Sequence, residues 1–272
     1  MTAYRKCIEA LDNLPHCADI TRKYCGRYSG ILLVDGKFVK VKGWESKIPV
    51  IYGIDFLTHD IPTFLFTVGE NFVSFVKFFT SLRLLNYPLR SLVSDENLNI
   101  PNACRKIYPK MCWQLCTNHL KENIRASLGV RTNPEHRPFV RSIEHLFKQK
   151  ISMDNFNRIA SGILKDYIHN ETYVQILLDI ERRKDNLLAF LKVRDTPQTN
   201  NLIECFNSHL QGRLDTVKGF ESFKHANSWL NGYFLRRRTT KFTDCSGRFK
   251  KLNGKTSLQM SLKDGVDLPR IF

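Results

Sequence analysis

The sequence predicts a mixed α/β fold, in which a five-stranded mixed sheet is flanked by helices and interrupted by an all-helical insertion. Five short segments between residues 31 and 116 are predicted strands, and the first three of them are rich in Val, Ile and Phe. The first three follow one another through short links, which favours an antiparallel meander, and the last two alternate with helical patterns. Residues 131–195 are highly charged and poor in strand signals, so we expect helices there.

The composition limits the function classes. The chain has 272 residues, which fits one large domain or one domain with an insertion, and 42% hydrophobic residues suffice for a core. A net charge of +16 predicts a polyanionic partner, either nucleic acid or an anionic membrane surface. No apolar run is long enough to span a bilayer, and residues 1–20 do not resemble a signal peptide. Nucleic acid is therefore the favoured partner.

The cysteines indicate an intracellular protein. There are eight of them in a large, basic chain without a signal sequence, a setting in which disulfides are unusual. We expect reduced thiols, most of them buried as small apolar groups.

The elements before the insertion are expected in a definite order. A polar leader (1–29) contains a helix near 5–14, and strands follow at 48–57 and 61–68 after a first strand region that begins at 31. A helix over 70–87 is predicted from apolar residues at helical spacing. Next come a strand at 89–95, a helix at 97–108 with proline in an early turn, a strand at 110–116, and a helix from 117.

Two further helices are expected after the insertion. One begins after Pro197 and covers 196–214, and the other covers 219–242. The tail from 243 contains Gly and Lys and reads as a loop.

The stretch "LLVDGKFVKV" has two interpretations. Asp-Gly between alternating hydrophobic residues is a strong hairpin signal, which would put Asp35 at a corner. Alternatively, one long strand runs through the stretch and carries Asp35 on one face with Lys37 and Val39. This window alone favours the hairpin.

Three carboxylates are candidates for chemistry. Asp95 ends a predicted strand, where ligands gather in open α/β sheets, and the competing interpretation is that it caps the next helix. Glu204 is the one charge on a helical arc otherwise made of amides and a hydroxyl: Asn200, Asn207, Ser208 and Gln211. Clustered carboxylates are stable mainly around divalent cations, and two such ions can clamp a phosphodiester. An ordinary exposed glutamate remains the simpler interpretation of Glu204.

Four motifs in order resemble the DDE-class transposases of the Mutator-like and bacterial insertion-sequence type. They are "LLVDGKFVKV", "LVSDENLNI", "QLCTNHLKENI" and "TNNLIECFNSHLQGRL", and "LNGYFLRRRTTKF" is similar to a later segment. The resemblance covers residues 30 to about 255. It implies a ribonuclease-H-like catalytic domain formed by 30–130 and 196–242, with the insertion at 131–195, a basic tail at 243–272, and a leader that is a remnant of a DNA-recognition region.

The resemblance also implies an active site and a reaction. Asp35 would lie within one continuous strand near 31–42, and Asp35, Asp95 and Glu204 would hold two Mg²⁺ ions, for which Mn²⁺ can substitute. His119 would contact the scissile phosphate or position water, and the residues near the site are Cys116, Asn200 and Asn207. The reaction would be cleavage and strand transfer of double-stranded DNA, at element ends and target, by a homodimer or higher oligomer without a membrane partner. The protein would be DNA-associated, in the cytoplasm or nucleoid of a bacterium or in a eukaryotic nucleus.

Basic residues near these motifs are expected to bind DNA through its phosphates. The candidates are Lys37, Lys40, Arg213, Arg236, Arg237, Arg238 and Lys241. For any one of them, a generic solubilising surface is the competing explanation.

Several alternatives remain open at this level. Cys104, Cys112, Cys116 and His119 suggest a zinc site, with irregular spacing. Cys7, His16, Cys17 and Cys25 suggest either a remnant of a metal-binding region or, more simply, a loosely packed leader. Other functions for the same fold are a repair or junction nuclease and an inactive DNA-binding remnant. The short leader suggests a truncated or split enzyme.

Overall fold

The computed structural model describes residues 3–148 and 151–272, so Met1 and Thr2 of the predicted leader and Gln149 and Lys150 of the predicted insertion lie outside the described residues. The chain forms two compact units. The first unit comprises Met1–Leu92, Leu98–Met111 and Asn201–Phe272, and the second comprises Val93–Asn97 and Cys112–Asn200. Each is described by itself below.

The predicted five-stranded mixed sheet is confirmed, with strand order β3-β2-β1-β4-β5. The strands are β1 (Ile31–Val39), β2 (Ile48–Asp55), β3 (Phe64–Phe66), β4 (Ser91–Ser94) and β5 (Cys112–Leu115). The first three form the expected antiparallel meander. At the start of β4, the backbone N–H groups of Arg90 and Ser91 both donate to the carbonyl of Gly30, so β1 and β4 begin side by side.

Strand β1 runs through the Asp-Gly pair without turning. Asp35 is paired with Tyr52 and Gly36 with Ile51 in the antiparallel register of β2. A two-residue hairpin needs positive φ at its central residues, and neither Asp35 nor Gly36 has it. The hairpin interpretation is therefore wrong and the continuous strand is confirmed, because apolar residues on both sides of the pair are buried against β2. The regular strand ends at Val39, a little before the expected 42.

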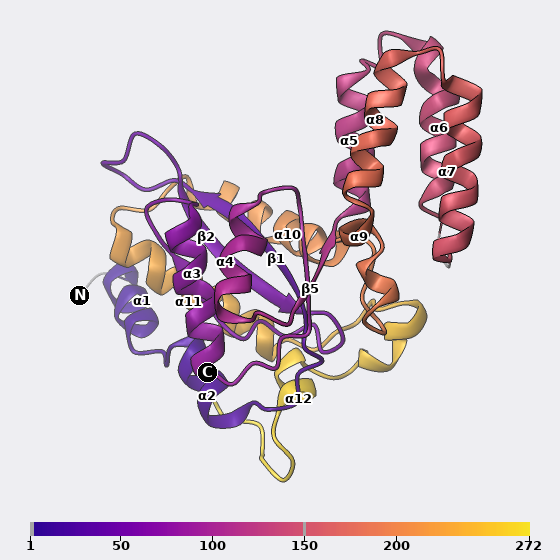
Figure 1. The fold of residues 1–272 in the computed structure, drawn as a ribbon. Helices are drawn as coiled ribbons and strands as arrows, with labels where there is room; N and C mark the ends of the chain where they lie inside the picture. The colour runs from indigo at the N-terminus through magenta and orange to yellow at the C-terminus, as the bar shows by residue number, and fades with distance from the viewer. Residues whose placement is uncertain (1–2, 149–150) are drawn as a thin grey trace. The chain divides into compact units, whose positions relative to one another are not determined.

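Helices cover both faces of the first unit's strands (Figure 1). Helices α3 (Phe72–Leu84) and α4 (Asn99–Ile107) pack together on one face, with α3 against β2 and β3. Helices α10 (Asn201–Val217) and α11 (Phe223–Thr239) lie behind the sheet, where α10 contacts β1. The apolar side chains that α3 buries are Phe75, Phe78, Phe79 and Leu82. The helical period seen in the sequence therefore marks the sheet-facing side of this helix.

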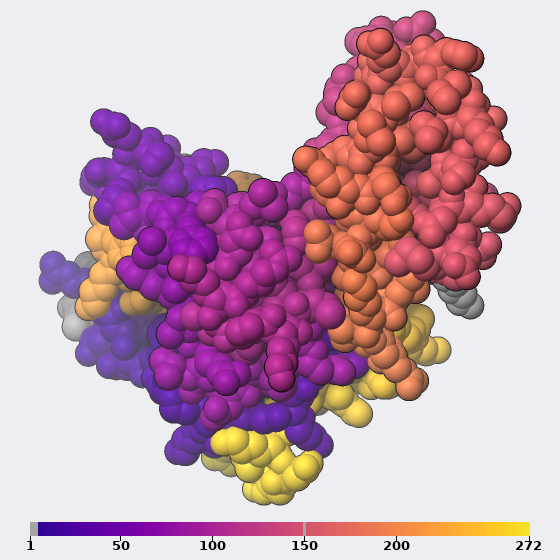
Figure 2. All heavy atoms as spheres, viewed as in Figure 1, coloured from indigo at the N-terminus to yellow at the C-terminus, as the bar shows by residue number. Residues whose placement is uncertain are grey.

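The two ends of the chain are folded into the first unit. They form α1 (Ala3–Asp12), α2 (Cys17–Tyr24), the 3₁₀ helix η3 (Gly247–Leu252) and α12 (Ser257–Ser261). Cys25 pairs with Leu262 in a β-bridge, and the N-terminal indigo atoms lie beside the yellow C-terminal atoms in Figure 2. Since Cys17, Ile20 and Cys25 are buried, the expectation of a loosely packed leader is wrong, as is that of a tail made only of loop.

A buried ion pair holds these ends in place. Arg238 on α11 and Asp60 are both fully buried, and the Nε and Nη2 groups of Arg238 each donate to Asp60 at 2.8 Å. Nη1 of Arg238 also donates to the carbonyl of Cys17, while the hydroxyls of Ser257 and Ser261 donate to Asp60. Burial opposes ionisation of Asp60, but the charge and hydrogen bonds of Arg238 outweigh it, so the pKa of Asp60 is lowered.

The second unit contains a helical bundle. Its main helices are α5 (Thr117–Ser127), α6 (Arg137–Leu146), α7 (Met153–Tyr167) and α8 (Glu171–Arg182), followed by the short α9 (Lys184–Leu187) and η2 (Ala189–Leu191), with η1 (Pro134–His136) before α6. Helix α6 packs against α5 and α7, and α7 packs against α8 (Figure 1). The ring of Phe139 stacks on that of Tyr173 with centroids 4.0 Å apart, and Phe156 is fully buried. Within the described part of 131–195 the regular elements are helical, as predicted.

Among the described helices, none combines the length and apolarity that crossing a bilayer requires.

Candidate active site

The first unit holds Asp35 in a hydrogen-bonded chain of three side chains. Nδ2 of Asn207 on α10 donates to Oδ2 of Asp35 at 2.6 Å, and the phenol of Tyr52 donates to Oδ1 of Asn207. The backbone N–H of Gly36 donates to the other oxygen of Asp35 at 2.8 Å. Both carboxylate oxygens are thus oriented, which fixes the carboxylate on the β1 strand.

Glu204 lies one helical turn before Asn207 on α10. Residues three apart on an α-helix are surface neighbours, so Glu204 and Asn207 share one side of α10, and Asn207 is bonded to Asp35. The helix is fixed in rotation by the buried Ile203, Phe206 and Leu210. Asn207 is itself buried, so the expected arc of exposed polar groups is wrong at this residue. The amide is inside because the hydroxyl of Tyr52 and the carboxylate of Asp35 satisfy it.

The polar chain lies in a low-dielectric environment. Burial, together with the negative charge of Asp35, raises the pKa of Tyr52 well above its ordinary value, so Tyr52 remains a neutral donor. A Cβ atom on Gly36 would lie 3.1 Å from Oε1 of Glu70, so glycine lets a second acidic side chain approach β1. Tyr52 and Glu70 were not identified from the sequence. The only available signal was the position of Tyr52 in an apolar strand that pairs with β1.

In the second unit, Asp95 directly follows β4. Its Oδ1 accepts the backbone N–H of Asn97 at 3.1 Å, which shapes a tight turn. The N-cap of α4 is Leu98 and not Asp95, so the capping interpretation of Asp95 is wrong. Ser94 anchors the end of the strand, because its hydroxyl accepts the Trp113 indole N–H and its carbonyl accepts the N–H of Cys116.

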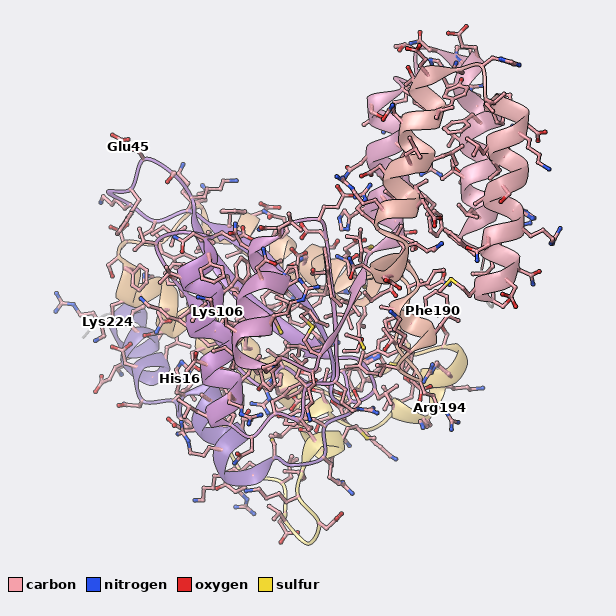
Figure 3. The ribbon with its side chains drawn as sticks, viewed as in Figure 1. His16, Glu45, Lys106, Phe190, Arg194 and Lys224 are labelled. Atoms are coloured by element: carbon pink, nitrogen blue, oxygen red, sulfur yellow. The ribbon has the colours of Figure 1, made fainter. Side chains whose placement is uncertain are left out.

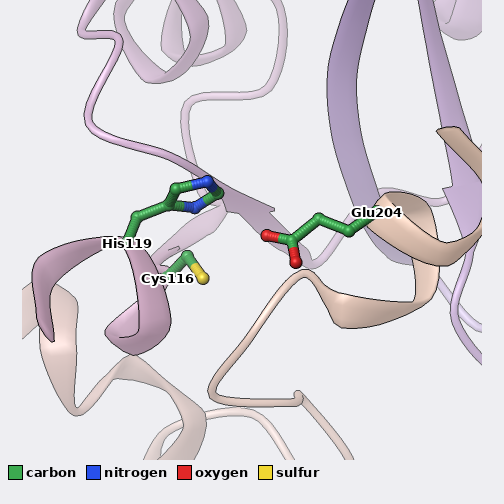
Figure 4. Close-up of side chains that lie close together, drawn as sticks. All are labelled: Cys116, His119 and Glu204. Carbon is green, nitrogen blue, oxygen red and sulfur yellow. The ribbon is translucent and has the colours of Figure 1, made fainter. Parts of the chain in front are cut away.

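The Cys-x-x-His element begins helix α5. Cys116 is the N-cap residue of α5, and His119 lies in its first turn. Figure 4 shows the side chains of Cys116, His119 and Glu204. The Cys116 thiol donates to Oδ1 of Asn200 at 3.0 Å, and both residues are buried. Among the described residues, Nδ2 of Asn200 has no hydrogen-bond partner. This buried amide therefore has donor capacity left over.

The zinc alternative is not supported. Within residues 3–148 and 151–272, no group of three potential ligands includes Cys104 or Cys112. Burial raises the pKa of the Cys104 thiol strongly, which disfavours the thiolate that zinc needs. Cys17 and Cys25 have raised pKa values for the same reason, and their sulfurs contact Arg238. A guanidinium therefore fills the space between these two thiols.

The predicted DNA-binding residues differ in exposure. Arg238 is fully buried in the ion pair with Asp60, so the prediction that it contacts DNA is wrong. Arg237 is half-buried, with its guanidinium 4.9 Å from the ring centroid of Phe242, and Lys37 is also half-buried. The exposed candidates are Lys40, Arg213, Arg236 and Lys241. In the run of three arginines, Arg236 is therefore at the surface, Arg237 lies over an aromatic ring, and Arg238 is in the core.

Comparisons of the sequence with known proteins match transposases. The family model "Transposase, Mutator family" matches residues 24–231. Two curated relatives, from Staphylococcus aureus and Enterococcus faecalis, are each described as the transposase for insertion sequence element IS256 in transposon Tn4001, and each is 21% identical over 180 residues. The aligned region is 65% of this chain and 45% of each relative, so the chain spans about half the length of the curated relatives it matches.

A solved structure is also similar at low level. The chain titled Drosophila P element transposase strand transfer complex is 11% identical, with a TM-score of 0.31, over 96% of this chain and 83% of that chain.

Proposed function

Because the chain belongs to the Mutator family of transposases, we propose that it catalyses metal-dependent cleavage and strand transfer of DNA during the transposition of a mobile element. The observation that carries the proposal is the hydrogen bond between Asn207 and Asp35. It joins the first acidic motif to the last one across a long stretch of chain.

Asp35, Asp95 and Glu204 are proposed to hold two Mg²⁺ ions, with Mn²⁺ as a substitute. The donors fit, because hard divalent cations prefer carboxylate oxygens and Glu204 shares the side of α10 that contacts Asp35. Asp95 enters the proposal through its sequence motif and its place directly after β4, because ligands gather beyond the ends of strands in open α/β sheets.

The protein's own residues have distinct tasks in this proposal. When bound, a pair of metal ions supplies an activated water or 3′-hydroxyl and stabilises the leaving oxygen of the phosphodiester. Asn207 holds the Asp35 carboxylate in one orientation. His119 contacts the scissile phosphate or positions the attacking water, with Cys116 and Asn200 supporting that end of α5. The exposed basic residues bind double-stranded DNA at element ends and target.

The catalytic domain is proposed to be ribonuclease-H-like, formed by 30–130 and 196–242 with 131–195 inserted, and to act as a homodimer or higher oligomer on DNA. Support comes from the strand order β3-β2-β1-β4-β5, in which β4 is the neighbour of β1 and β5 lies at the edge. In the sequence, helices α6 to α8 lie between the second and third acidic motifs.

Substitution of the three carboxylates tests the proposal. Asp35→Asn, Asp95→Asn and Glu204→Gln should each abolish Mg²⁺-dependent cleavage of DNA that carries the element's terminal repeats. Each should also weaken Mn²⁺ binding measured by calorimetry without DNA. Asp166→Asn, at an exposed position on α7, is the matched control and should behave as wild type.

Two outcomes would replace the proposal. Cleavage of branched DNA without any joining of ends would indicate a junction nuclease. Salt-sensitive DNA binding by the wild type, with neither cleavage nor Mn²⁺ binding, would indicate a DNA-binding remnant.

A further inference from the structure

A small basic pocket lies where β1 ends. It has a volume of about 180 Å³ and lies entirely within the first unit. Its lining includes Phe38, Lys40, Lys47, Leu214, Lys218 and Phe220. Small-molecule and cofactor sites are usually about 300–1,000 Å³. The pocket is therefore too small for a typical cofactor, and its ligand should be a smaller group.

The pocket is built by hydrogen bonds between distant segments. The N–H of Phe220 donates to the carbonyl of Lys40 at 2.9 Å, and the N–H of Lys42 donates to the carbonyl of Phe220 at 2.8 Å. These bonds attach the segment after α10 to the end of β1. The loop from 40 to 47, whose tip carries Glu45 in Figure 3, brings Lys47 to the same pocket.

The charges in the pocket favour an anion. None of the amino groups of Lys40, Lys47 and Lys218 has an ion-pair partner among the residues that the structure describes. The one acidic residue in the lining, Asp215, accepts a hydrogen bond from Gln211 at 2.6 Å. Three lysines against one engaged carboxylate leave a net positive pocket, which suits phosphate oxygens.

Phe38 adds a stacking surface. Its side chain is 46% exposed although it lies on a strand whose other apolar residues are buried. An aromatic ring beside unpaired cations is the combination with which proteins bind unpaired nucleotides, since every base has a π-face and every nucleotide a phosphate. A single exposed ring would be unremarkable without the lysines.

Lys218 has a backbone conformation that favours glycine. Its φ is +58°, directly after the end of α10, where glycine is the usual residue. Gly219 follows with φ +121° and lies against Lys40. Among the described residues, no ion pair of the Lys218 amino group offsets the conformational cost of this position. The strained position therefore points to a ligand for the side chain.

We propose that this pocket binds one nucleotide of the DNA substrate that is outside the duplex stack, with its base on Phe38 and its phosphate among Lys40, Lys47 and Lys218. The inference rests on the proposed function for the identity of the substrate. Phe38 lies three residues beyond Asp35 on β1, about 10 Å along the strand at the usual rise, and on the opposite face because successive side chains alternate. The pocket is therefore separate from the proposed carboxylate site.

Two variants and two substrates test the pocket. The substrates are a duplex with a short single-stranded tail containing 2-aminopurine and the same duplex with a blunt end. Phe38→Ala should weaken binding of the tailed duplex about tenfold and abolish the quenching of 2-aminopurine, with blunt-end binding unchanged. Leu84→Ala removes a comparably exposed side chain from α3 and should change neither measurement.

Lys218→Gly removes the side-chain charge without destabilising the backbone. Glycine relieves the positive φ, so the variant should be as stable as wild type or more so, yet bind the tailed duplex more weakly and with a smaller salt dependence. Lys77→Ala, at an exposed position on α3, removes an equal charge and should leave the preference for the tailed duplex unchanged.

The outcomes separate this inference from the proposed function. If the carboxylate variants lose cleavage while Phe38→Ala and Lys218→Gly bind the tailed duplex as wild type does, the pocket proposal is refuted and the proposed function stands. If the pocket variants lose binding of the tailed duplex while no variant affects cleavage, the proposed function is refuted and the pocket proposal stands.

Discussion

Asn207 donates a hydrogen bond of 2.6 Å to Asp35 across 172 residues of the sequence. The same amide accepts from Tyr52, which faces Asp35 in the neighbouring strand. The amide therefore fixes helix α10 against strand β1 at one polar point in an apolar interface. Since buried polar groups are costly unless they are paired, the arrangement specifies how these two elements align.

Removal of the amide should impair the site more than the fold. We expect Asn207→Ala to weaken Mn²⁺ binding and DNA cleavage about 10- to 100-fold, because Asp35 loses the partner that orients it. Tyr52→Phe should have a smaller effect and lower the free energy of unfolding by about 1 kcal/mol. Ser208→Ala is the control, since this exposed hydroxyl bonds only within α10. Wild-type metal binding by Asn207→Ala would show that the amide has no positioning role.

The buried ion pair should dominate the stability of the first unit. Arg238→Met leaves the Asp60 carboxylate buried without its partner, so we expect the free energy of unfolding to fall by about 3–5 kcal/mol. Arg236→Met removes the same charge from an exposed position and should change it by less than about 0.5 kcal/mol. Urea unfolding measures both. Equal, small losses of unfolding free energy in the two variants would mean that the Arg238–Asp60 ion pair is dispensable.

Gly30 is the residue that permits β1 and β4 to start together. Its φ is +75°, and a Cβ atom there would lie 2.2 Å from the carbonyl oxygen of Pro88. We expect Gly30→Ala to destabilise the protein by about 2 kcal/mol or more, because the clash is with backbone. Gly212→Ala, in the open middle of α10, should stabilise it by about 0.5–1 kcal/mol. Thermal unfolding of the two variants should thus shift in opposite directions.

His59 should make stability depend on pH in the acidic range. Burial, helped by the charge of Arg237, lowers the pKa of His59 to about 4, from an ordinary value of 6.5. The unfolded chain therefore binds a proton between these values while the folded chain does not. The contribution of neutral His59 is complete above pH 6.5 and is lost as the pH falls toward 4, by about 3 kcal/mol at most.

A substitution tests this pH dependence. Asparagine tolerates the positive φ of 56° at residue 59, so His59→Asn should fold and lose less stability than wild type between about pH 7 and about pH 4.5. His169→Asn, at an exposed position, should follow the wild-type curve. Parallel curves for His59→Asn and wild type would contradict the assignment.

Most of the secondary structure was predictable because it depends on local patterns. Phe75, Phe79 and Leu82 recur at helical spacing and form the buried side of α3. The apolar runs around residues 31, 48 and 91 became strands of one sheet. The local pattern wrongly predicted a turn at Asp35-Gly36, because pairing along all of β2 outweighs the turn signal. It also failed at the two ends of the chain, where short helices depend on packing.

By itself the sequence determined the fold class and the continuous strand implied by the family motifs, because these follow from periodicity and from ordered motifs, and it predicted which acidic residues would carry the chemistry. Only the tertiary structure decided which charges are available. It put Arg238 in the core against Asp60, bonded Asn207 to Asp35, and left Lys218 facing a pocket. The physical reason is that burial and pairing set the free energy of a polar group, and both depend on residues distant in sequence.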